Sequence, residues 1–315
     1  MVSNGRNGRQ HPNLLVTGAS GNLGHWICRL AVKKWAVTGI HWQHLFSMDG
    51  VKSVRADLSD LSVLENLLVA VKPSAVIHTA AVSQMMQCEQ HPKATRLINV
   101  AAAEKLSALC AGLRIPFVFT STDLVFDGLS APYAEQDPMN PVCVYGCQKA
   151  EAEAAVLNVN GDALVCRMPL MIGVGPRAAS SFSIQMLFNI RQGRALQLFT
   201  DEFRTPVTYR DAARGLLAVI GKACGPLHMG GRFRVSRFDL GLRMAEQMGI
   251  APTMIQPVTL RSLNLGVARS PDCSLVSDKA FALGYDPAPL SKAIQWVVKQ
   301  FSAISTVSTT RRQSS

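Results

Sequence analysis

Short runs of apolar residues rich in Val, Ile and Phe alternate along the first half of the chain with longer stretches rich in Ala and Leu. Apolar runs of four or five residues are typical of strands that are buried on both faces, as in a parallel sheet. The predicted strands cover residues 14–17, 36–40, 75–78, 117–120 and 163–166. Helical patterns lie between them at 26–30, 100–111 and 150–158. The alternation predicts an α/β fold, a doubly wound parallel sheet with helices on both faces.

The regular alternation weakens after Pro169, where helical patterns at 181–193 and 238–248 are separated by pieces rich in Pro and Gly. We therefore expect a Rossmann domain that binds the cofactor at 13–168. Residues 169–302 are expected to form mainly a smaller, discontinuous substrate-binding region, with a strand and helices that return to the first domain. The polar segments 1–12 and 303–315 are predicted to be disordered tails.

Composition excludes several classes of protein. Of the 315 residues, 48% are hydrophobic and 17% are charged, which suits a packed core and not a disordered chain. No apolar run approaches the roughly 18 residues that span a bilayer, and the N-terminus lacks the apolar stretch of a signal peptide. The eight cysteines include no C-x-x-C pair. We expect a cytoplasmic protein with reduced thiols, no membrane association and no metal site.

The chain is basic, with 32 Lys and Arg against 21 Asp and Glu. These charges are scattered, and aromatic residues make up only 6% of the chain, so neither a basic cluster nor a platform for stacking bases indicates a nucleic-acid partner. A basic surface does suit a small anionic ligand. The expected partner is a small molecule.

Glycine spacing gives the first candidate site. The first predicted strand runs into Thr-Gly-Ala-Ser-Gly-Asn-Leu-Gly at residues 17–24, directly before a helical pattern. Glycines in this position let the backbone turn sharply and approach a pyrophosphate, whose charge the helix N-terminus stabilises. The loop predicts a dinucleotide site.

Two further motifs follow in order. Tyr145 and Lys149 are four residues apart and share one helical face. An ammonium nearby lowers the pKa of a tyrosine, and such a tyrosine can donate a proton to a carbonyl oxygen. Ser121 and Thr122 follow the strand at 117–120, at the end of the sheet where α/β proteins bind ligands. Together the three motifs point to reduction of a ketone.

With these motifs in place, the chain resembles the extended short-chain dehydrogenase/reductases, and more narrowly the dTDP-4-dehydrorhamnose reductase family. The resemblance covers about residues 13–295. Besides the three motifs, it is carried by Asp57-Leu58, His78-Thr79-Ala80-Ala81, Glu89, Pro92, Asn99-Val100, Pro141–Lys149, Glu151, Glu153, Arg167, Arg204-Thr205-Pro206 and Arg269–Leu275.

The resemblance implies roles for individual residues. Tyr145 would be the catalytic acid, Lys149 its partner and a ligand of the nicotinamide ribose, and Thr122, not Ser121, the catalytic hydroxyl. The implied reaction reduces a 4-keto-deoxysugar nucleotide with hydride from the nicotinamide. The expected cofactor-binding residues are Gly18, Ser20, Gly21, Asn22, Leu23, Gly24, His41, His44, Asp57, Leu58, Ala80, Ala81, Tyr145, Lys149 and Met168. The expected substrate-binding residues are Ser83, Gln84, Met85, Asp123 and Arg204.

The segment after the second strand bears on the cofactor. NAD-binding domains usually carry a carboxylate there, which holds the ribose 2′-hydroxyl. This chain has His41, Trp42, Gln43 and His44, and no acid before Asp49. The pattern favours NADP and leaves NAD open.

The chain also departs from the family's pattern. Residues 82–89 lack the Asp and the aromatic residue that the family commonly has, Leu124 follows Asp123 where a Tyr is common, and Asp201-Glu202 stands in place of Asp-Gln. Apolar residues follow the predicted strand ends, namely Met85, Met86, Leu124, Met168, Met171 and Ile172. The substrate is therefore either a nucleotide sugar or a less polar ketone.

Other readings of the same chain stay open. One is a sugar-nucleotide epimerase. Another is a non-catalytic, NADP-binding regulatory subunit like that of methionine adenosyltransferase, which resembles the same family. The sequence also leaves open whether the chain forms a homodimer.

Overall fold

A computed structural model describes residues 11–176, 181–263 and 265–310 of the chain. Its centre is a seven-stranded sheet with the strand order β11-β6-β5-β4-β1-β2-β3, and every neighbouring pair is parallel. The strands are β1 (Asn13–Thr17), β2 (Ala36–His41), β3 (Val51–Arg55), β4 (Ala75–His78), β5 (Phe117–Thr122), β6 (Leu164–Met168) and β11 (Gly225–His228). The predicted doubly wound α/β fold is confirmed.

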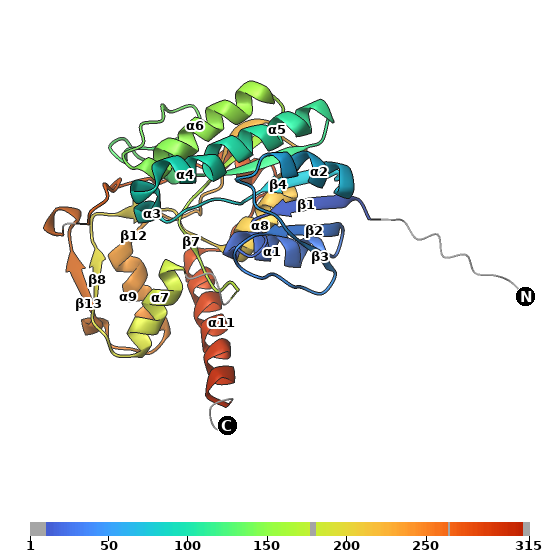
Figure 1. The fold of residues 1–315 in the computed structure, drawn as a ribbon. Helices are drawn as coiled ribbons and strands as arrows, with labels where there is room; N and C mark the ends of the chain where they lie inside the picture. The colour runs from blue at the N-terminus through green and yellow to red at the C-terminus, as the bar shows by residue number, and fades with distance from the viewer. Residues whose placement is uncertain (1–10, 177–180, 264, 311–315) are drawn as a thin grey trace, which may run out of the picture.

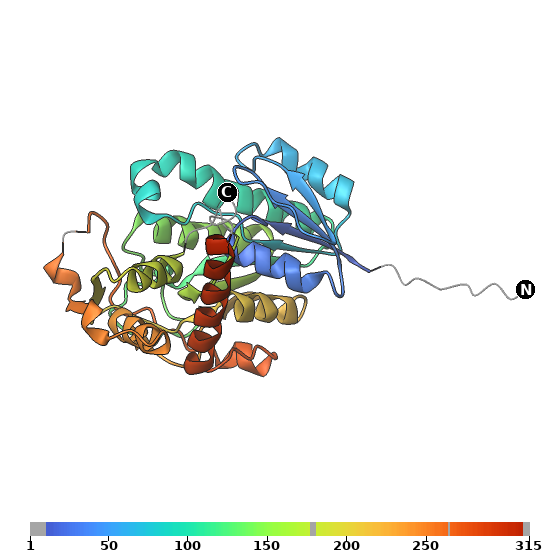
Figure 2. The ribbon, with the colours of Figure 1, turned by 90° about the horizontal axis from the view of Figure 1, so that it is seen from below.

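Helices cover both faces of this sheet (Figures 1 and 2). One face packs against α1 (Asn22–Ala31) and α8 (Tyr209–Val219), and the other against α2 (Ser62–Val71), α5 (Ala102–Gly112) and α6 (Val144–Val159). On β1, Leu14 and Val16 join the first core and Leu15 the second, because successive side chains of a strand point to opposite faces.

Two strands of the central sheet, β3 and β11, are not predicted by the hydrophobic pattern, and they lie at its two edges. Much of β3 is exposed, and its sequence Val-Lys-Ser-Val-Arg is too polar to stand out as a buried run. Strand β11 reads Gly-Pro-Leu-His, and edge strands tolerate such residues. Residues 225–228 thus return to the central sheet beside β6.

The second half of the chain builds a separate core below the sheet in Figure 1. Its main elements are α7 (Phe182–Arg191), β8 (Leu196–Phe199), α9 (Arg237–Gln247), β13 (Ile255–Val258) and α11 (Leu290–Thr310). The predicted helical patterns at 181–193 and 238–248 correspond to α7 and α9. Short strands pair nearby as β7 (Met171–Ile172) with β10 (Val207–Thr208), and β9 (Phe203–Arg204) with β12 (Val235–Ser236).

Short helical elements complete the chain. They are α3 (Met85–Gln90), α4 (Pro92–Arg96), η1 (Leu97–Ala101), η2 (Asp123–Val125), η3 (Pro252–Met254), η4 (Leu260–Ser262) and α10 (Asp278–Ala282). The domain boundary at residue 168 remains a proposal.

The ends of the chain differ in part from the expected tails. Helix α11 continues to Thr310, so much of the segment 303–315 is helical and not an irregular tail. The rest of that segment, 311–315, and most of the expected N-terminal tail, 1–10, lie outside the described residues. Within the described ranges, no helix combines the length and the apolar character needed to cross a membrane.

Candidate functional site

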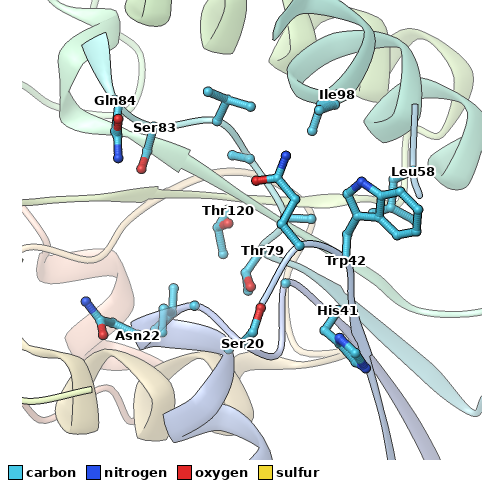
Figure 3. A pocket seen from close by; sticks show the side chains of 18 of the residues that line it. Ser20, Asn22, His41, Trp42, Leu58, Thr79, Ser83, Gln84, Ile98 and Thr120 are labelled. Carbon is cyan, nitrogen blue, oxygen red and sulfur yellow. The ribbon is translucent and has the colours of Figure 1, made fainter. Parts of the chain in front are cut away.

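A cavity of about 700 Å³ runs along the carboxyl ends of β1, β2, β4 and β5. All the residues predicted to bind the cofactor line it, from the glycines of the 17–24 loop to Met168 at the end of β6. Figure 3 shows His41, Trp42 and Leu58 at one end of this cavity and Ser83 and Gln84 at the other. The structure therefore brings the predicted set together in one place.

The glycine-rich loop has the geometry that a close approach requires. Gly18 has a φ of +71°, and a Cβ there would lie 2.8 Å from the backbone nitrogen of Ala80. A Cβ on Gly24 would collide with the carbonyl oxygen of Gly18. Gly21, in contrast, caps α1 with an ordinary φ of −76°, and its nearest neighbour would be the Gly18 oxygen at 3.2 Å. The loop thus presents bare backbone and the N-terminus of α1 to the cavity.

A tryptophan and an arginine mark the far end of the cavity, beyond β2. Trp42 lines the cavity, and the Arg55 guanidinium lies 4.7 Å from the centre of its ring. His41 is buried, and its Nδ1 lies 3.0 Å from the carbonyl oxygen of His44. The Asp57 carboxylate accepts hydrogen bonds from the backbone nitrogen and the hydroxyl of Ser59. The cationic group here, Arg55, was not singled out from the sequence.

Tyr145 lies in the first turn of α6 and lines the cavity. It packs with Cys88 and Cys143 and is 9% exposed. Burial raises the pKa of its hydroxyl, and the nearby Asp123 carboxyl adds to the increase. The expectation that Lys149 lowers the pKa of Tyr145 is therefore wrong for this structure, because burial outweighs the charge of a lysine held elsewhere.

Lys149 lies one turn further along α6 and is 1% exposed. Its Nζ donates a 2.6 Å hydrogen bond to the carbonyl oxygen of Thr120 and lies 3.8 Å from the centre of the Phe119 ring. Burial lowers the pKa of Lys149 to about 7. Burial, with the Lys149 charge nearby, lowers the pKa of His78 to about 3, so His78 is neutral beside it.

The two hydroxyl residues at the end of β5 face different cavities. Ser121 lines the cofactor-sized cavity with Tyr145, and its Oγ has no partner among the described residues. Thr122 lines a second cavity of about 360 Å³. Its Oγ1 accepts from the Leu124 backbone nitrogen and donates to Asp123 Oδ1 at 3.2 Å. Four residues line both cavities, namely Ser83, Gln84, Met171 and Tyr209, so the two spaces adjoin.

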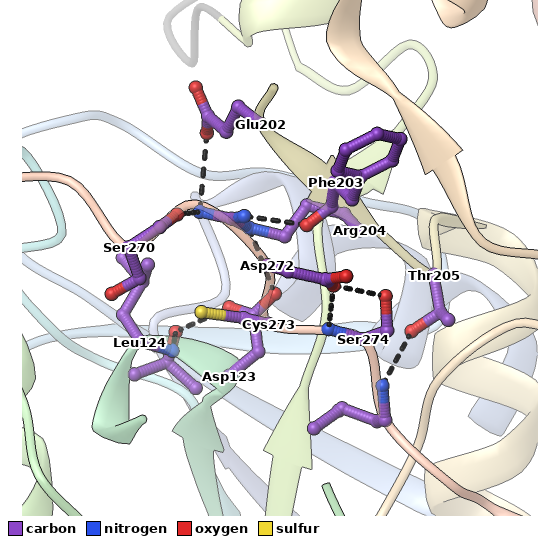
Figure 4. Close-up of polar contacts among 12 residues, drawn as sticks. Asp123, Leu124, Glu202, Phe203, Arg204, Thr205, Ser270, Asp272, Cys273 and Ser274 are labelled. Atoms are coloured by element: carbon purple, nitrogen blue, oxygen red, sulfur yellow. Dashed lines mark hydrogen bonds and ion pairs between the residues drawn. The ribbon is translucent and has the colours of Figure 1, made fainter. Parts of the chain in front are cut away.

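The predicted substrate-binding residues all line this second cavity. Asp123 and Arg204 form an ion pair with an Nε–Oδ2 distance of 3.4 Å, and both are almost completely buried. Burial raises the pKa of Asp123, and Arg204 opposes the increase. Arg204 also donates to the carbonyl oxygens of Phe203 and Ser270 and pairs with Glu202 (Figure 4). Its guanidinium is thus occupied by the protein itself.

Several residues that line the two cavities have no role assigned from the sequence. Arg237, at the start of α9, and Tyr209, at the start of α8, lie in segments where no motif drew attention to them. Arg269 belongs to a segment that carries the family resemblance, but it received no role. No local pattern marks these positions, because the fold brings them from three separate parts of the chain.

The described residues hold neither a cluster of metal ligands nor a disulfide. Within residues 11–176, 181–263 and 265–310, no three His, Cys, Asp or Glu side chains are grouped so as to hold a metal. The eight cysteines are free, and six of them are buried.

Comparison with known proteins identifies the family. The model of the RmlD substrate binding domain matches residues 12–303. A probable low-salt glycan biosynthesis reductase of Haloferax volcanii is 30% identical over 259 residues, which are 81% of this chain and 86% of that protein. Methionine adenosyltransferase 2 subunit beta of Xenopus laevis is 28% identical over 254 residues, which are 78% of this chain and 75% of that protein.

A solved structure matches the fold. The dTDP-4-dehydrorhamnose reductase of Bacillus anthracis in complex with NADP superposes with a TM-score of 0.79 at 18% identity, covering 93% of this chain and 99% of the other. The family model shows that the chain belongs to the RmlD substrate binding domain family, and the solved structure shows that it has the same overall fold.

Proposed function

We propose that the protein reduces a keto group with NADPH, with the cofactor in the first cavity and Tyr145 as the proton donor. The observation that carries the proposal is that the glycine-rich loop, Tyr145 and Lys149 line one continuous cavity. The loop fits a dinucleotide, because its three glycines line the cavity and the N-terminus of α1 provides positive polarity for a pyrophosphate. When bound, the nicotinamide supplies the hydride.

The side chains supply the rest of the chemistry. The raised pKa of Tyr145 keeps its hydroxyl protonated at neutral pH, as a proton donor to a ketone oxygen must be. Thr122, in the adjoining cavity, is proposed to hold that oxygen by rotating its hydroxyl proton from Asp123 Oδ1 to the substrate. Lys149, with a pKa of about 7, exchanges a proton readily at neutral pH and is proposed to stabilise the tyrosinate as it forms.

The preference for NADP over NAD is also proposed. No carboxylate follows β2, and Arg55 lies over Trp42 at that end of the cavity. Arg55 is proposed to bind the 2′-phosphate, which NAD lacks. Arg55→Ala should weaken NADPH binding about 10-fold or more and leave NADH binding nearly unchanged, since a hydrogen bond to a charged group contributes roughly 1.5–3 kcal/mol. Equal losses for both cofactors would contradict this role.

A nucleotide sugar remains the first substrate class to test, on the strength of the family resemblance. The alternative substrate, a less polar ketone, is suggested by the apolar residues that follow the predicted strand ends. Met85, Leu124 and Met171 do line the second cavity. Met168 lines the first cavity, Ile172 lies in the core and Met86 is 45% exposed. The second cavity therefore combines apolar walls with a cluster of arginines.

A second candidate function is that of a non-catalytic subunit. The similarity to subunit beta of methionine adenosyltransferase 2 over 78% of the chain favours it. In that case the protein would bind NADPH, show no turnover alone and form a stoichiometric complex with a methionine adenosyltransferase catalytic subunit.

The test uses the purified full-length protein. NADPH binding is measured by fluorescence titration, and oxidation of NADPH is followed at 340 nm with dTDP-4-dehydrorhamnose and with simple ketones. Reduction of any of these supports the proposal. Binding of NADPH without any turnover, together with capture of the catalytic subunit in a mixture, would favour the second candidate. Absence of NADPH binding would overturn both.

A further inference from the structure

Three arginines converge on one carboxylate in the wall of the second cavity. Glu202 is 1% exposed, and its oxygens lie 3.2 Å from Arg204 Nη2, 3.1 Å from Arg237 Nη2 and 3.4 Å from Arg269 Nη1. Figure 4 shows the Arg204 side of this arrangement, with Glu202 above the guanidinium. The chain thus places its own anion in the middle of an arginine cluster.

Two of the three arginines each have a hydrogen-bond donor that no other described residue uses. Arg237 Nη1 and Arg269 Nε are buried and have no hydrogen-bond partner among the described residues. Both residues line the cavity, and they come from different elements, the start of α9 and the segment before β-bridge residue Asp272. A buried, unpaired guanidinium N–H is costly, and the oxygen atoms of an anionic ligand bound in the cavity would supply partners for these donors.

The charge of the cluster limits what that ligand can be. Despite its burial, Glu202 has a pKa lowered by the three arginines, and the ion pair with Arg204 opposes the burial that raises the pKa of Asp123. With both carboxylates ionised, they face the three guanidinium groups of Arg204, Arg237 and Arg269, which leaves one net positive charge. A carboxylate carries a single negative charge and would neutralise this one net positive charge. A phosphate monoester carries about −1.5 to −2 at neutral pH, and a diphosphate carries at least as much.

The surroundings favour a compact and mainly apolar molecule. The Phe182 ring lies 4.5 Å from the Arg237 guanidinium, within the range of a cation–π contact. Met85, Leu124 and Leu170 form apolar wall, and the volume is about 360 Å³. Thr122, proposed to hold the ketone oxygen, lines the same cavity.

We propose that the substrate is a keto acid whose carboxylate binds Arg237 and Arg269, with its ketone directed toward Thr122. The proposal deepens the reductase function and rests on it. Glu202 is then a specificity-determining residue, because its charge fills the part of the arginine cluster that would otherwise attract a second negative charge.

The test measures binding and turnover separately, with the full-length protein saturated with NADP⁺ for binding and with NADPH for turnover. The probes are straight-chain oxo acids with two to six carbons between the carboxylate and the ketone, the methyl ester of each acid, inorganic phosphate and dTDP. At least one oxo acid should bind about 10- to 100-fold more tightly than its ester, as expected for loss of a charge-assisted hydrogen bond. It should also be reduced with a correspondingly lower KM.

Variants locate the site. Arg237→Gln should weaken oxo acid binding about 10-fold or more and raise KM more than it lowers kcat. Arg243→Gln makes the same change at an exposed position of the same helix and should leave both quantities unchanged. Glu202→Gln should raise the affinity for dTDP, because it adds one net positive charge to the cluster. Thermal unfolding of each variant shows whether it is folded.

The outcomes separate this inference from the proposed function. Equal binding of acids and esters, no binding of any oxo acid, or tighter binding of dTDP than of every oxo acid in the wild-type protein would overturn the keto acid proposal, even if NADPH-dependent reduction of another ketone is found. Carboxylate binding that depends on Arg237, without reduction of any oxo acid, would retain the anion site and overturn the keto acid as substrate. The reductase is overturned only if dTDP-4-dehydrorhamnose and the simple ketones are not reduced either.

Discussion

Tyr145 combines burial with access to the first cavity, and its raised pKa leaves a proton available for transfer. We expect Tyr145→Phe to lower kcat for ketone reduction at least about 100-fold, because only the proton donor is lost. Steady-state kinetics measure the effect. Fluorescence titration with NADPH is the control, since cofactor affinity should stay close to that of the wild type. Near-normal turnover would remove Tyr145 from the mechanism.

Lys149 makes stability depend on pH. Its pKa is about 7 in the folded protein and roughly 10.4 in an unfolded chain, so the unfolded state binds more protons between these values. The free energy of unfolding should therefore rise with pH across this window, and the penalty of the buried ammonium is largest below pH 7. In Lys149→Met this contribution disappears.

Urea unfolding at pH 7, 8.5 and 10 tests whether stability rises with pH in this way. The free energy of unfolding of the wild type minus that of Lys149→Met should increase with pH. Lys105→Met, on an exposed position of α5, should keep the wild-type dependence. A difference that is flat or falls with pH would mean that Lys149 stays charged in the folded protein throughout.

Two glycines in the turn between β1 and α1 have different roles, one in ligand binding and one in packing. Gly21 has an ordinary φ, and a Cβ there would make one tight contact, 3.2 Å from the Gly18 oxygen, whereas a Cβ on Gly24 would collide with the Gly18 carbonyl group. We expect Gly21→Val to fold normally and to lose NADPH binding, because its side chain projects where the pyrophosphate approaches. Gly24→Ala should lower the free energy of unfolding by about 1–3 kcal/mol through overpacking. Thermal unfolding measures the stability of both variants, and titration with NADPH measures their affinity for the cofactor. If Gly21→Val keeps micromolar affinity for NADPH, the loop is only a structural turn.

A buried ion pair ties distant parts of the whole molecule together. Arg167 of β6 binds Glu153 of α6 at 2.9 Å and donates to the carbonyl oxygen of Glu135 at 3.1 Å, and His228 of the edge strand β11 lies beside it. Arg167→Met should lower the free energy of unfolding by about 3–5 kcal/mol, because it leaves the Glu153 carboxylate buried and unpaired. The double variant Arg167→Met/Glu153→Leu should be more stable than Arg167→Met. Chemical unfolding measures the free energy of unfolding of both variants. A double variant less stable than Arg167→Met would contradict the ion-pair explanation.

The two cavities also depend on the whole molecule. The first is built by the carboxyl ends of the parallel strands, which parallel topology brings to one edge of the sheet. The second needs residues as distant in sequence as Ser83 and Arg269. Its arginine cluster exists only once the start of α9 and the segment before Asp272 have packed around Glu202.

The sequence by itself determined the central sheet, the glycine-rich loop and the pairing of Tyr145 with Lys149, because these depend on local hydrophobic runs and short spacings. It missed β3 and β11, since edge strands need no continuous apolar run. Only the tertiary structure decided that Lys149 is buried against Phe119 and leaves the pKa of Tyr145 high. It also decided that Arg204, expected to bind substrate, is neutralised by Asp123 and Glu202, while Arg237 and Arg269 keep free donors. Burial and charge pairing arise from residues far apart in the chain, and no local pattern encodes them.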